Sequence, residues 1–233
     1  MTEEQRRALA ETKVWLFDLD NTLYPASCNL FDQIHVRMRD YLMDYFKVDE
    51  EEAGRIRRKY FLEHGTTLSG LMVNDKIDPT GFLDYVHDID LSPVQPNPAL
   101  DAALSRLPGR KLIFTNADVG HAENVMARLG VAHHFEAIFD IVGADYICKP
   151  NPAPYAQIVA DYGVPAESAV MLDDMSVNLE PAAALGMQTV WVRTHYNWAG
   201  DEVEDPDHVH HVTEDVTAWL EGVVGASWSG PLA

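Results

Sequence analysis

Acidic side chains occur in two closely spaced pairs, and each pair follows a short apolar run of the chain. The pairs are Asp18 with Asp20 and Asp173 with Asp174. On an extended segment the carboxylates of Asp18 and Asp20 point to the same side. If both pairs meet at one edge of a sheet, as many as four negative charges gather there, which only a cation makes tolerable. Hard oxygen ligands of this kind favour Mg²⁺, so the sequence predicts a magnesium site.

Thr115, Asn116 and Lys149 follow other apolar or β-branched stretches of the chain. Lys149 stands just before a helix that we expect to begin at Asn151-Pro152, where the helix macrodipole disfavours a cation. A bound anion would compensate for this placement. The N–H groups of the turn, the Lys149 ammonium and the Thr115 hydroxyl offer donors suited to a phosphate. A metal site, an anion site and a carboxylate free to attack together indicate phosphoryl transfer.

Short apolar, β-branched runs alternate with helical patterns, and this alternation predicts a parallel sheet. Each run is apolar on both faces, as expected of strands covered by helices on either side. We therefore expect an α/β fold, a three-layer sandwich around a Rossmann-like sheet, with ligands at the carboxyl ends of the strands. The expected strands are Val14–Phe17, Leu112–Phe114, Ile138–Val142, Ala169–Leu172 and Thr189–Val192.

Residues 18–111 separate the first two of these runs, far more chain than one crossover needs. Helical patterns fill the stretch, and the prolines within 93–98 resemble a strap that returns the chain to the sheet. We predict a Rossmann-like catalytic core of residues 1–24 and 98–233. Residues 25–97 are predicted to form an inserted helical cap.

Four segments resemble the four motifs of the haloacid dehalogenase-like superfamily, in the same order and at the same strand ends. The segments are Asp18-Leu19-Asp20-Asn21-Thr22-Leu23-Tyr24, Phe114-Thr115-Asn116, Lys149-Pro150 and Leu172-Asp173-Asp174 with Asn178. The helical insertion after the first motif is similar to that superfamily's cap in its first insertion position. A stretch of this insertion resembles the pyrimidine 5′-nucleotidase branch, namely His64-Gly65-Thr66-Thr67-Leu68 with Gly70-Leu71.

The resemblance implies a catalytic role for each matched residue of the core. Asp18 would attack phosphorus and form an aspartyl-phosphate, and Asp20 would protonate the leaving oxygen and later activate water. Thr115 and Lys149 would hold the phosphoryl oxygens, and Lys149 would also shield Asp18 from its acidic neighbours. The resemblance further implies that Mg²⁺ is bound by Asp18, the carbonyl of Asp20 and Asp174.

Asp173 has two possible roles under this resemblance. It either binds the metal directly or orients a metal-bound water, and Asn178 is expected to contact the ligands of the metal. The candidates for substrate binding are Asn116, Tyr24, His64 and Thr67. Tyr24 and the two cap residues could stack on a base or hydrogen-bond to it.

The charge balance excludes several kinds of partner. Lysine and arginine total 17 and aspartate and glutamate total 37, a net charge of −20. Such a field repels nucleic acid and anionic membrane surfaces, so we expect neither as a partner. No run approaches the ~20 apolar residues of a membrane span, and no signal peptide is recognisable. We expect a cytoplasmic monomer or homodimer that binds a small phosphorylated metabolite and keeps Cys28 and Cys148 as thiols.

These features favour a Mg²⁺-dependent phosphatase for small phosphate monoesters, with 5′-nucleotides, pyrimidine ones in particular, as the first substrates to test. Asp20 favours phosphate esters over haloacids, because an alkoxide leaving group needs a proton and a halide does not. A sugar-phosphate or phosphoglycolate phosphatase would share every core residue and remains the alternative enzyme. A catalytically idle, phosphate-binding interaction protein is the alternative of another class.

Overall fold

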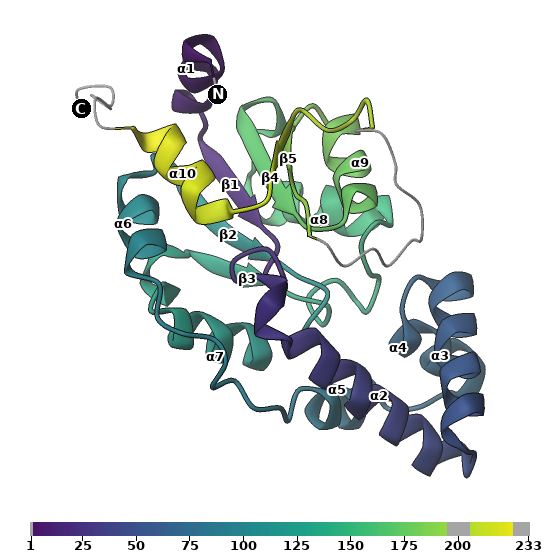
Figure 1. Cartoon of the computed structure of the whole chain (residues 1–233). Helices are drawn as coiled ribbons and strands as arrows, with labels where there is room; N and C mark the ends of the chain where they lie inside the picture. Colours follow the sequence, from purple (N-terminus) through teal and green to yellow (C-terminus); the bar gives the residue numbers. More distant parts are fainter. Residues whose placement is uncertain (1, 195–205, 226–233) are drawn as a thin grey trace.

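The computed structural model describes residues 2–194 and 206–225. In this part of the chain six strands form one sheet in the order β3-β2-β1-β4-β5-β6, and all neighbouring strands are parallel (Figure 1). The predicted parallel α/β architecture is confirmed. The strands are β1 Val14–Phe17, β2 Arg110–Phe114, β3 Ala137–Phe139, β4 Ala169–Asp173, β5 Gln188–Val192 and β6 His211–Thr213.

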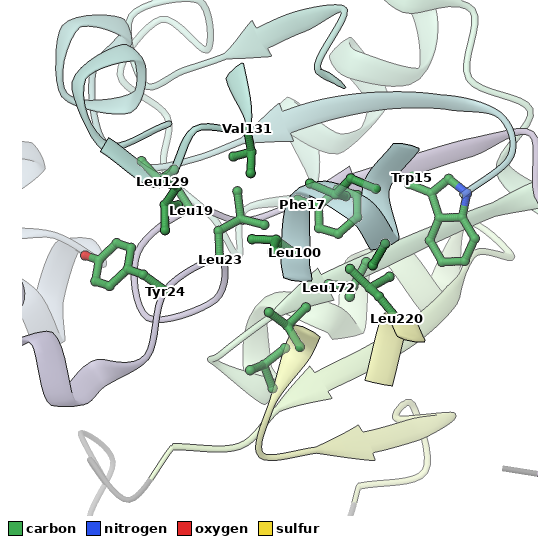
Figure 2. Packing of buried hydrophobic residues seen from close by; sticks show 14 of the residues in the cluster. Trp15, Phe17, Leu19, Leu23, Tyr24, Leu100, Leu129, Val131, Leu172 and Leu220 are labelled. Carbon is green, nitrogen blue, oxygen red and sulfur yellow. The ribbon is translucent and has the colours of Figure 1, made fainter. Parts of the chain in front are cut away.

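Helices cover both faces of the sheet, which confirms the three-layer sandwich (Figure 1). One layer contains α1 Glu3–Ala10, α6 Pro98–Arg106, α7 Val119–Leu129 and α10 Val216–Val224. The other layer contains α8 Pro152–Tyr162 and α9 Ser176–Ala184. Successive side chains of β1 point to opposite faces. Trp15 and Phe17 pack against the first layer, as Figure 2 shows, whereas Val14 and Leu16 pack against the second.

The third predicted strand, Ile138–Val142, ends early, at Phe139. The side chain of the next residue, Asp140, terminates the strand by hydrogen-bonding to the nearby backbone. One carboxylate oxygen accepts a hydrogen bond from Gly143 N–H at 2.8 Å, and the other accepts from Val119 N–H at 3.0 Å. Because a short acidic side chain that bonds the nearby backbone stabilises a turn, the extended conformation stops there.

Between β1 and β2 the chain forms a separate group of helices at the edge of the sheet where β1 ends (Figure 1). The helices are α2 Leu30–Phe46, α3 Glu50–His64, α4 Thr67–Gly70 and α5 Pro79–Val86, with a π-helical turn at Leu71–Asp75. Asp49 caps α3 by accepting from Glu52 N–H, and Asp78 with Pro79 begins α5. These inserted helices pack around a hydrophobic cluster that includes Ile34 and Phe82 and also Ile141 and Cys148 of the predicted core.

The division into a core and a cap at residues 24/25 and 97/98 stays a prediction. The predicted core also contains residues 195–205 and 226–233, which lie outside the described residues. Within the described ranges, no helix combines the length and the apolar character that crossing a membrane requires. Cys28 and Cys148 are both free thiols, as expected.

Candidate active site

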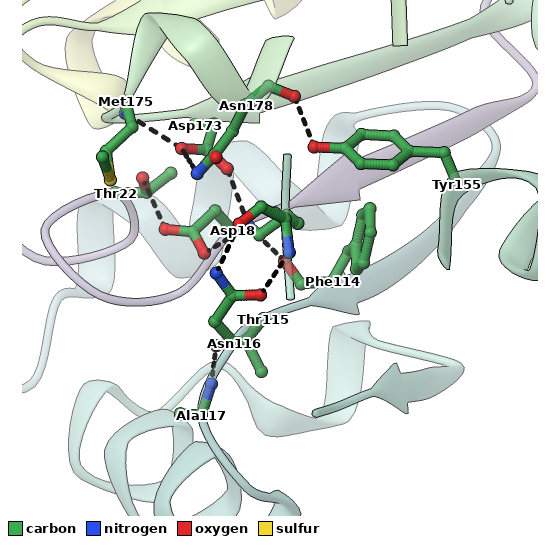
Figure 3. Close-up of polar contacts among 11 residues, drawn as sticks. Asp18, Thr22, Phe114, Thr115, Asn116, Ala117, Tyr155, Asp173, Met175 and Asn178 are labelled. Carbon is green, nitrogen blue, oxygen red and sulfur yellow. Dashed lines mark hydrogen bonds and ion pairs between the residues drawn. The ribbon is translucent and has the colours of Figure 1, made fainter. Parts of the chain in front are cut away.

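The acidic residues predicted to gather at one edge of the sheet lie together. β1 and β4 are neighbours with Phe17 beside Leu172, so the residues that end these strands emerge at the same level. Asp18 N–H donates to the carbonyl of Leu172 at 2.9 Å. Carboxylate oxygens of Asp18, Asp173 and Asp174 lie within 4.8 Å of one another. Figure 3 shows Asp18 and Asp173 pointing toward each other from the two strands.

Lys149 holds the centre of this cluster. Its ammonium donates to Asp18 Oδ1 at 2.8 Å, to Asp173 Oδ2 at 2.7 Å and to the carbonyl of Phe114 at 2.8 Å, which uses all three of its protons. Burial alone would lower the pKa of Lys149, but the two carboxylates raise it well above its ordinary value. Lys149 is therefore charged, and it separates Asp18 from Asp173. Its predicted contact with phosphoryl oxygens stays a prediction.

Asp173 is fixed by three donors and is fully buried. Besides Lys149 on Oδ2, its Oδ1 accepts from Met175 N–H at 2.9 Å and from Asn178 Nδ2 at 2.9 Å (Figure 3). Asn178 is itself held by Tyr155, whose hydroxyl donates to the Asn178 carbonyl at 2.6 Å. These contacts make Asp173 the group that positions Lys149. Direct binding of a metal by Asp173 stays a prediction.

The remaining carboxylates carry more negative charge than Lys149 offsets. Burial raises the pKa of Asp18 to about 7 despite the ion pair with Lys149, and Asp173 adds to the rise. Burial and the proximity of Asp18 likewise raise the pKa of Asp174 well above its ordinary range. Groups that resist ionisation together are suited to a divalent cation, and an all-oxygen set suits Mg²⁺. The residues present therefore fit the predicted ion, and its binding by Asp18 and Asp174 stays a prediction.

Magnesium should raise the melting temperature more at about pH 8 than at about pH 5.5. The pKa of Asp18 is about 7 in the folded protein and 3.8 for an unperturbed aspartate, the value expected in the unfolded chain. The free energy of unfolding of the metal-free protein therefore falls as the pH rises through that interval. The ion binds the deprotonated form and stabilises the fold, whereas protons compete with it below about pH 7. Thermal unfolding with and without Mg²⁺ at both pH values measures this. An equal rise at both pH values, or a rise that persists in Asp174→Asn, would contradict the site.

Asp20 is held away from the lysine by a different pair of donors. Its Oδ1 accepts from the Tyr24 hydroxyl at 2.6 Å and from His121 Nε2 at 2.8 Å. Burial would raise the pKa of Asp20, but His121 and Tyr24 lower it below its ordinary value. The sequence analysis missed His121. Tyr24 is buried, with its hydroxyl on Asp20, so its predicted contact with substrate stays a prediction.

The end of β2 is tied to the loop that carries Lys149. Asn116 Oδ1 accepts from Lys149 N–H at 2.8 Å, and its amide nitrogen lies 3.4 Å from the Lys149 carbonyl. Thr115 is buried and its hydroxyl oxygen accepts from Ala117 N–H at 3.0 Å, which leaves the hydroxyl proton free to donate (Figure 3). Thr22, to which the sequence analysis gave no role, donates to Asp18 Oδ2 at 3.1 Å.

The inserted helices reach the site next to Lys149. Gly65 adopts φ +81°, and a Cβ there would lie 3.0 Å from the sulfur of Cys148. A side chain at this position would strain the backbone and press on Cys148, the residue before Lys149. His64 and Thr67 flank this close approach; His64 Nε2 lies 3.0 Å from the Asn74 amide nitrogen, and Thr67 begins α4. Their predicted contact with substrate stays a prediction.

A second group of possible metal ligands lies where α6 meets the turn after α7. Asp101 Oδ1 is 2.7 Å from His134 Nε2 and 3.1 Å from His133 Nε2. Mixed imidazole and carboxylate ligands suit Zn²⁺ more than Mg²⁺. This group therefore does not compete with the strand-end carboxylates as the predicted magnesium site.

The fold and the strand-end residues define a hydrolase of the haloacid dehalogenase type. Residues 12–186 match the family model of the haloacid dehalogenase-like hydrolases, so the chain belongs to this family. The predicted membership is confirmed.

Curated relatives of the chain include proteins named as phosphatases. This chain is 30% identical to Phosphate metabolism protein 8 of Saccharomyces cerevisiae, in a match that covers 84% of this chain and 66% of the yeast protein. It is 27% identical to phosphoglycolate phosphatase of Rhodospirillum rubrum, with 79% of this chain and 81% of that enzyme covered. The chain thus spans just under two thirds of the yeast protein.

Solved structures share the fold at low sequence identity. A predicted phosphoglycolate phosphatase from Haemophilus somnus matches with a TM-score of 0.64 and 16% identity, over 91% of this chain and 97% of that one. A HAD phosphatase from Thermococcus onnurineus matches with a TM-score of 0.60 and 17% identity, over 91% of this chain and 98% of that one. These likenesses concern the fold.

Proposed function

We propose that the chain is a Mg²⁺-dependent phosphatase that hydrolyses small phosphate monoesters through an aspartyl-phosphate at Asp18. The arrangement around Asp18 carries the proposal. Lys149 fixes one oxygen of this carboxylate and Thr22 donates to the other, while Asp174 brings a second carboxylate to the same edge of the sheet. The phosphatases among the relatives support the same chemistry.

In this mechanism a carboxylate oxygen of Asp18 attacks phosphorus as the ester oxygen leaves. Asp20 gives its proton to the leaving oxygen and afterwards takes one from the water that hydrolyses the aspartyl-phosphate. The hydroxyl proton of Thr115 is free to donate to a phosphoryl oxygen. When bound, Mg²⁺ would supply positive charge against the phosphate and the carboxylates of Asp18 and Asp174. A cytoplasmic location and a monomeric or homodimeric state remain part of this proposal.

Pyrimidine 5′-nucleotides are the substrates we propose first. The inserted segment that suggested them, His64 to Leu68, lies against Cys148, the neighbour of Lys149, and this supports a role beside the reacting phosphate. Phosphoglycolate and sugar phosphates are the second candidates, because proteins named for such substrates are among the relatives.

A substrate panel tests the proposal. Purified protein is assayed against pyrimidine and purine 5′-nucleotides, sugar phosphates and phosphoglycolate, with and without Mg²⁺, with Asp18→Asn as the control for contaminating activity. We expect Mg²⁺-dependent turnover with the highest kcat/KM on pyrimidine 5′-nucleotides. A higher value on phosphoglycolate or a sugar phosphate would remove the nucleotide assignment and keep the mechanism. No turnover on any substrate would favour the idle phosphate-binding protein.

Asp20→Asn should slow the hydrolysis of alkyl phosphates far more than that of p-nitrophenyl phosphate. An alkoxide needs a proton as it leaves, and loss of a general acid costs about 10²–10⁴-fold, whereas nitrophenolate leaves without one. The rate of leaving-group release in a single turnover, before the aspartyl-phosphate is hydrolysed, measures the difference on both esters. Equal losses on the two esters would refute the acid role of Asp20.

A further inference from the structure

We propose that His121 positions the carboxyl group of Asp20 for proton transfer, and that His87, at the end of the inserted helix α5, holds His121 in place. The inference rests on the proposed function, because it concerns the residue assigned as general acid. His121 lies outside all four sequence motifs. Its Nε2 lies 2.8 Å from Asp20 Oδ1, although the two residues are 101 positions apart in the chain.

Packing alone does not explain why the imidazole of His121 is buried, whereas its contact with Asp20 does. The side chain is only 1% exposed, and its Nδ1 has no hydrogen-bond partner among the described residues. A buried polar atom without a partner costs free energy, so packing alone would favour an apolar residue at this position. A position where stability is sacrificed in this way is typical of a functional site. With His121 Nε2 as the donor, Asp20 Oδ1 accepts both when Asp20 is ionised and when Asp20 holds its proton on Oδ2.

The backbone of His121 is fixed independently of its ring. His121 lies in the first turn of α7, and its N–H donates to Asp118 Oδ1 at 2.9 Å as part of the helix cap. Asp118 also pairs through its other oxygen with Nδ1 of His87. One carboxylate therefore anchors both histidines, one by the backbone and the other by the ring.

His87 connects His121 to the inserted helices. It follows the last residue of α5, and its N–H donates to the carbonyl of Leu83 at 3.1 Å. Its ring stacks on the ring of His121, with the centroids 4.5 Å apart and the planes at 22°. Movement of α5 relative to the sheet would therefore be transmitted to the ring that contacts Asp20.

Two donors on the same oxygen define what the arrangement does to Asp20. Tyr24 and His121 both bind Oδ1, which fixes the orientation of the carboxyl group and leaves Oδ2 to exchange the proton with the leaving oxygen. Holding this carboxyl group in one orientation accelerates the steps that use it, which are protonation of the leaving oxygen and the later activation of water. Loss of His121 should therefore resemble a weaker form of the loss of Asp20.

The test compares His121→Leu, which removes the donor, with His121→Gln, which keeps an N–H donor. Rates are measured on an alkyl phosphate and on p-nitrophenyl phosphate, and thermal unfolding checks the fold. We expect His121→Leu to lower the single-turnover rate of leaving-group release about 30-fold on the alkyl ester and less than about 3-fold on the nitrophenyl ester, a part of the full effect of a general acid. His121→Gln should recover most of the loss, and His87→Leu should give a smaller loss with the same preference.

The matched control is His134→Leu. His134 also has a side chain only 10% exposed and contacts a single carboxylate, that of Asp101 at 2.7 Å, but neither residue belongs to the proposed machinery. We expect it to leave both rates unchanged. Equal losses on the two esters in folded His121 variants, or no loss, would overturn the positioning role. If Asp20→Asn itself shows no preference between the esters, the proposed function fails instead, so the two failures are distinguishable.

Discussion

Replacing Asp18 with asparagine should abolish turnover while the protein stays folded. The amide offers no nucleophilic oxygen of comparable strength, and removal of a catalytic nucleophile costs about 10⁴-fold or more. The fold should survive, because the amide oxygen can still accept from Lys149 or Thr22, and Lys149 keeps its partner Asp173. Steady-state rates and thermal unfolding measure the two effects.

The same variant identifies the intermediate. Acid quenching of wild-type protein during turnover should trap a chain heavier by one phosphoryl group, and Asp18→Asn should show none. Asp20→Asn is the matched control, since it keeps the nucleophile and should still form the intermediate from p-nitrophenyl phosphate. Ordinary turnover by Asp18→Asn would show that another group attacks phosphorus.

Lys149→Met should abolish activity and also destabilise the fold. The ammonium is 1% exposed and lies between Asp18 and Asp173, so its loss leaves two buried carboxylates facing each other. Removing one partner of a buried ion pair costs about 3–5 kcal/mol. For a chain of this size each kcal/mol lowers the melting temperature by about 2–4 °C, so we expect a fall of roughly 10 °C. Thermal unfolding of the metal-free proteins measures it.

Two further variants separate the charge effect from the loss of a buried side chain. Lys111→Met is the matched control, because Lys111 is also buried but donates to the carbonyls of Leu107 and Gly109. It should cost less stability and leave activity nearly intact. Adding Asp173→Asn to Lys149→Met should restore part of the stability and none of the activity. A Lys149→Met protein as stable as wild type would contradict the assigned ion pairs.

The sheet and the residues at its carboxyl edge could be predicted from the sequence, because both depend on local patterns. Apolar runs such as Val14–Phe17 mark buried strands directly, and parallel strands bring the residues at their carboxyl ends to one edge of the sheet. The meeting of Asp18, Asp173 and Asp174 is a consequence of these two facts. β6, which is only partly buried and carries no apolar run, gave no such signal.

Lys149 and Asn178 were expected beside the carboxylates, but other residues that hold the functional groups could not be predicted, because their contacts join segments far apart in the chain. His121 shows only the pattern of a helix start, and nothing local indicates that its ring meets Asp20 or the ring of His87. The early end of β3 likewise depends on Asp140 bonding the start of a different helix. Such contacts arise from packing, and sequence periodicity carries no information about them.

Locating the metal in a crystal tests the central claim most directly. Crystals grown with Mn²⁺ as a stand-in for Mg²⁺ and measured for anomalous scattering should show a peak between the carboxylates of Asp18 and Asp174, and the peak should vanish in Asp174→Asn. A peak only at Asp101, His133 and His134, or none at the ends of β1 and β4, would mean that no shared ion holds these carboxylates together. The phosphoryl-transfer account would then fail.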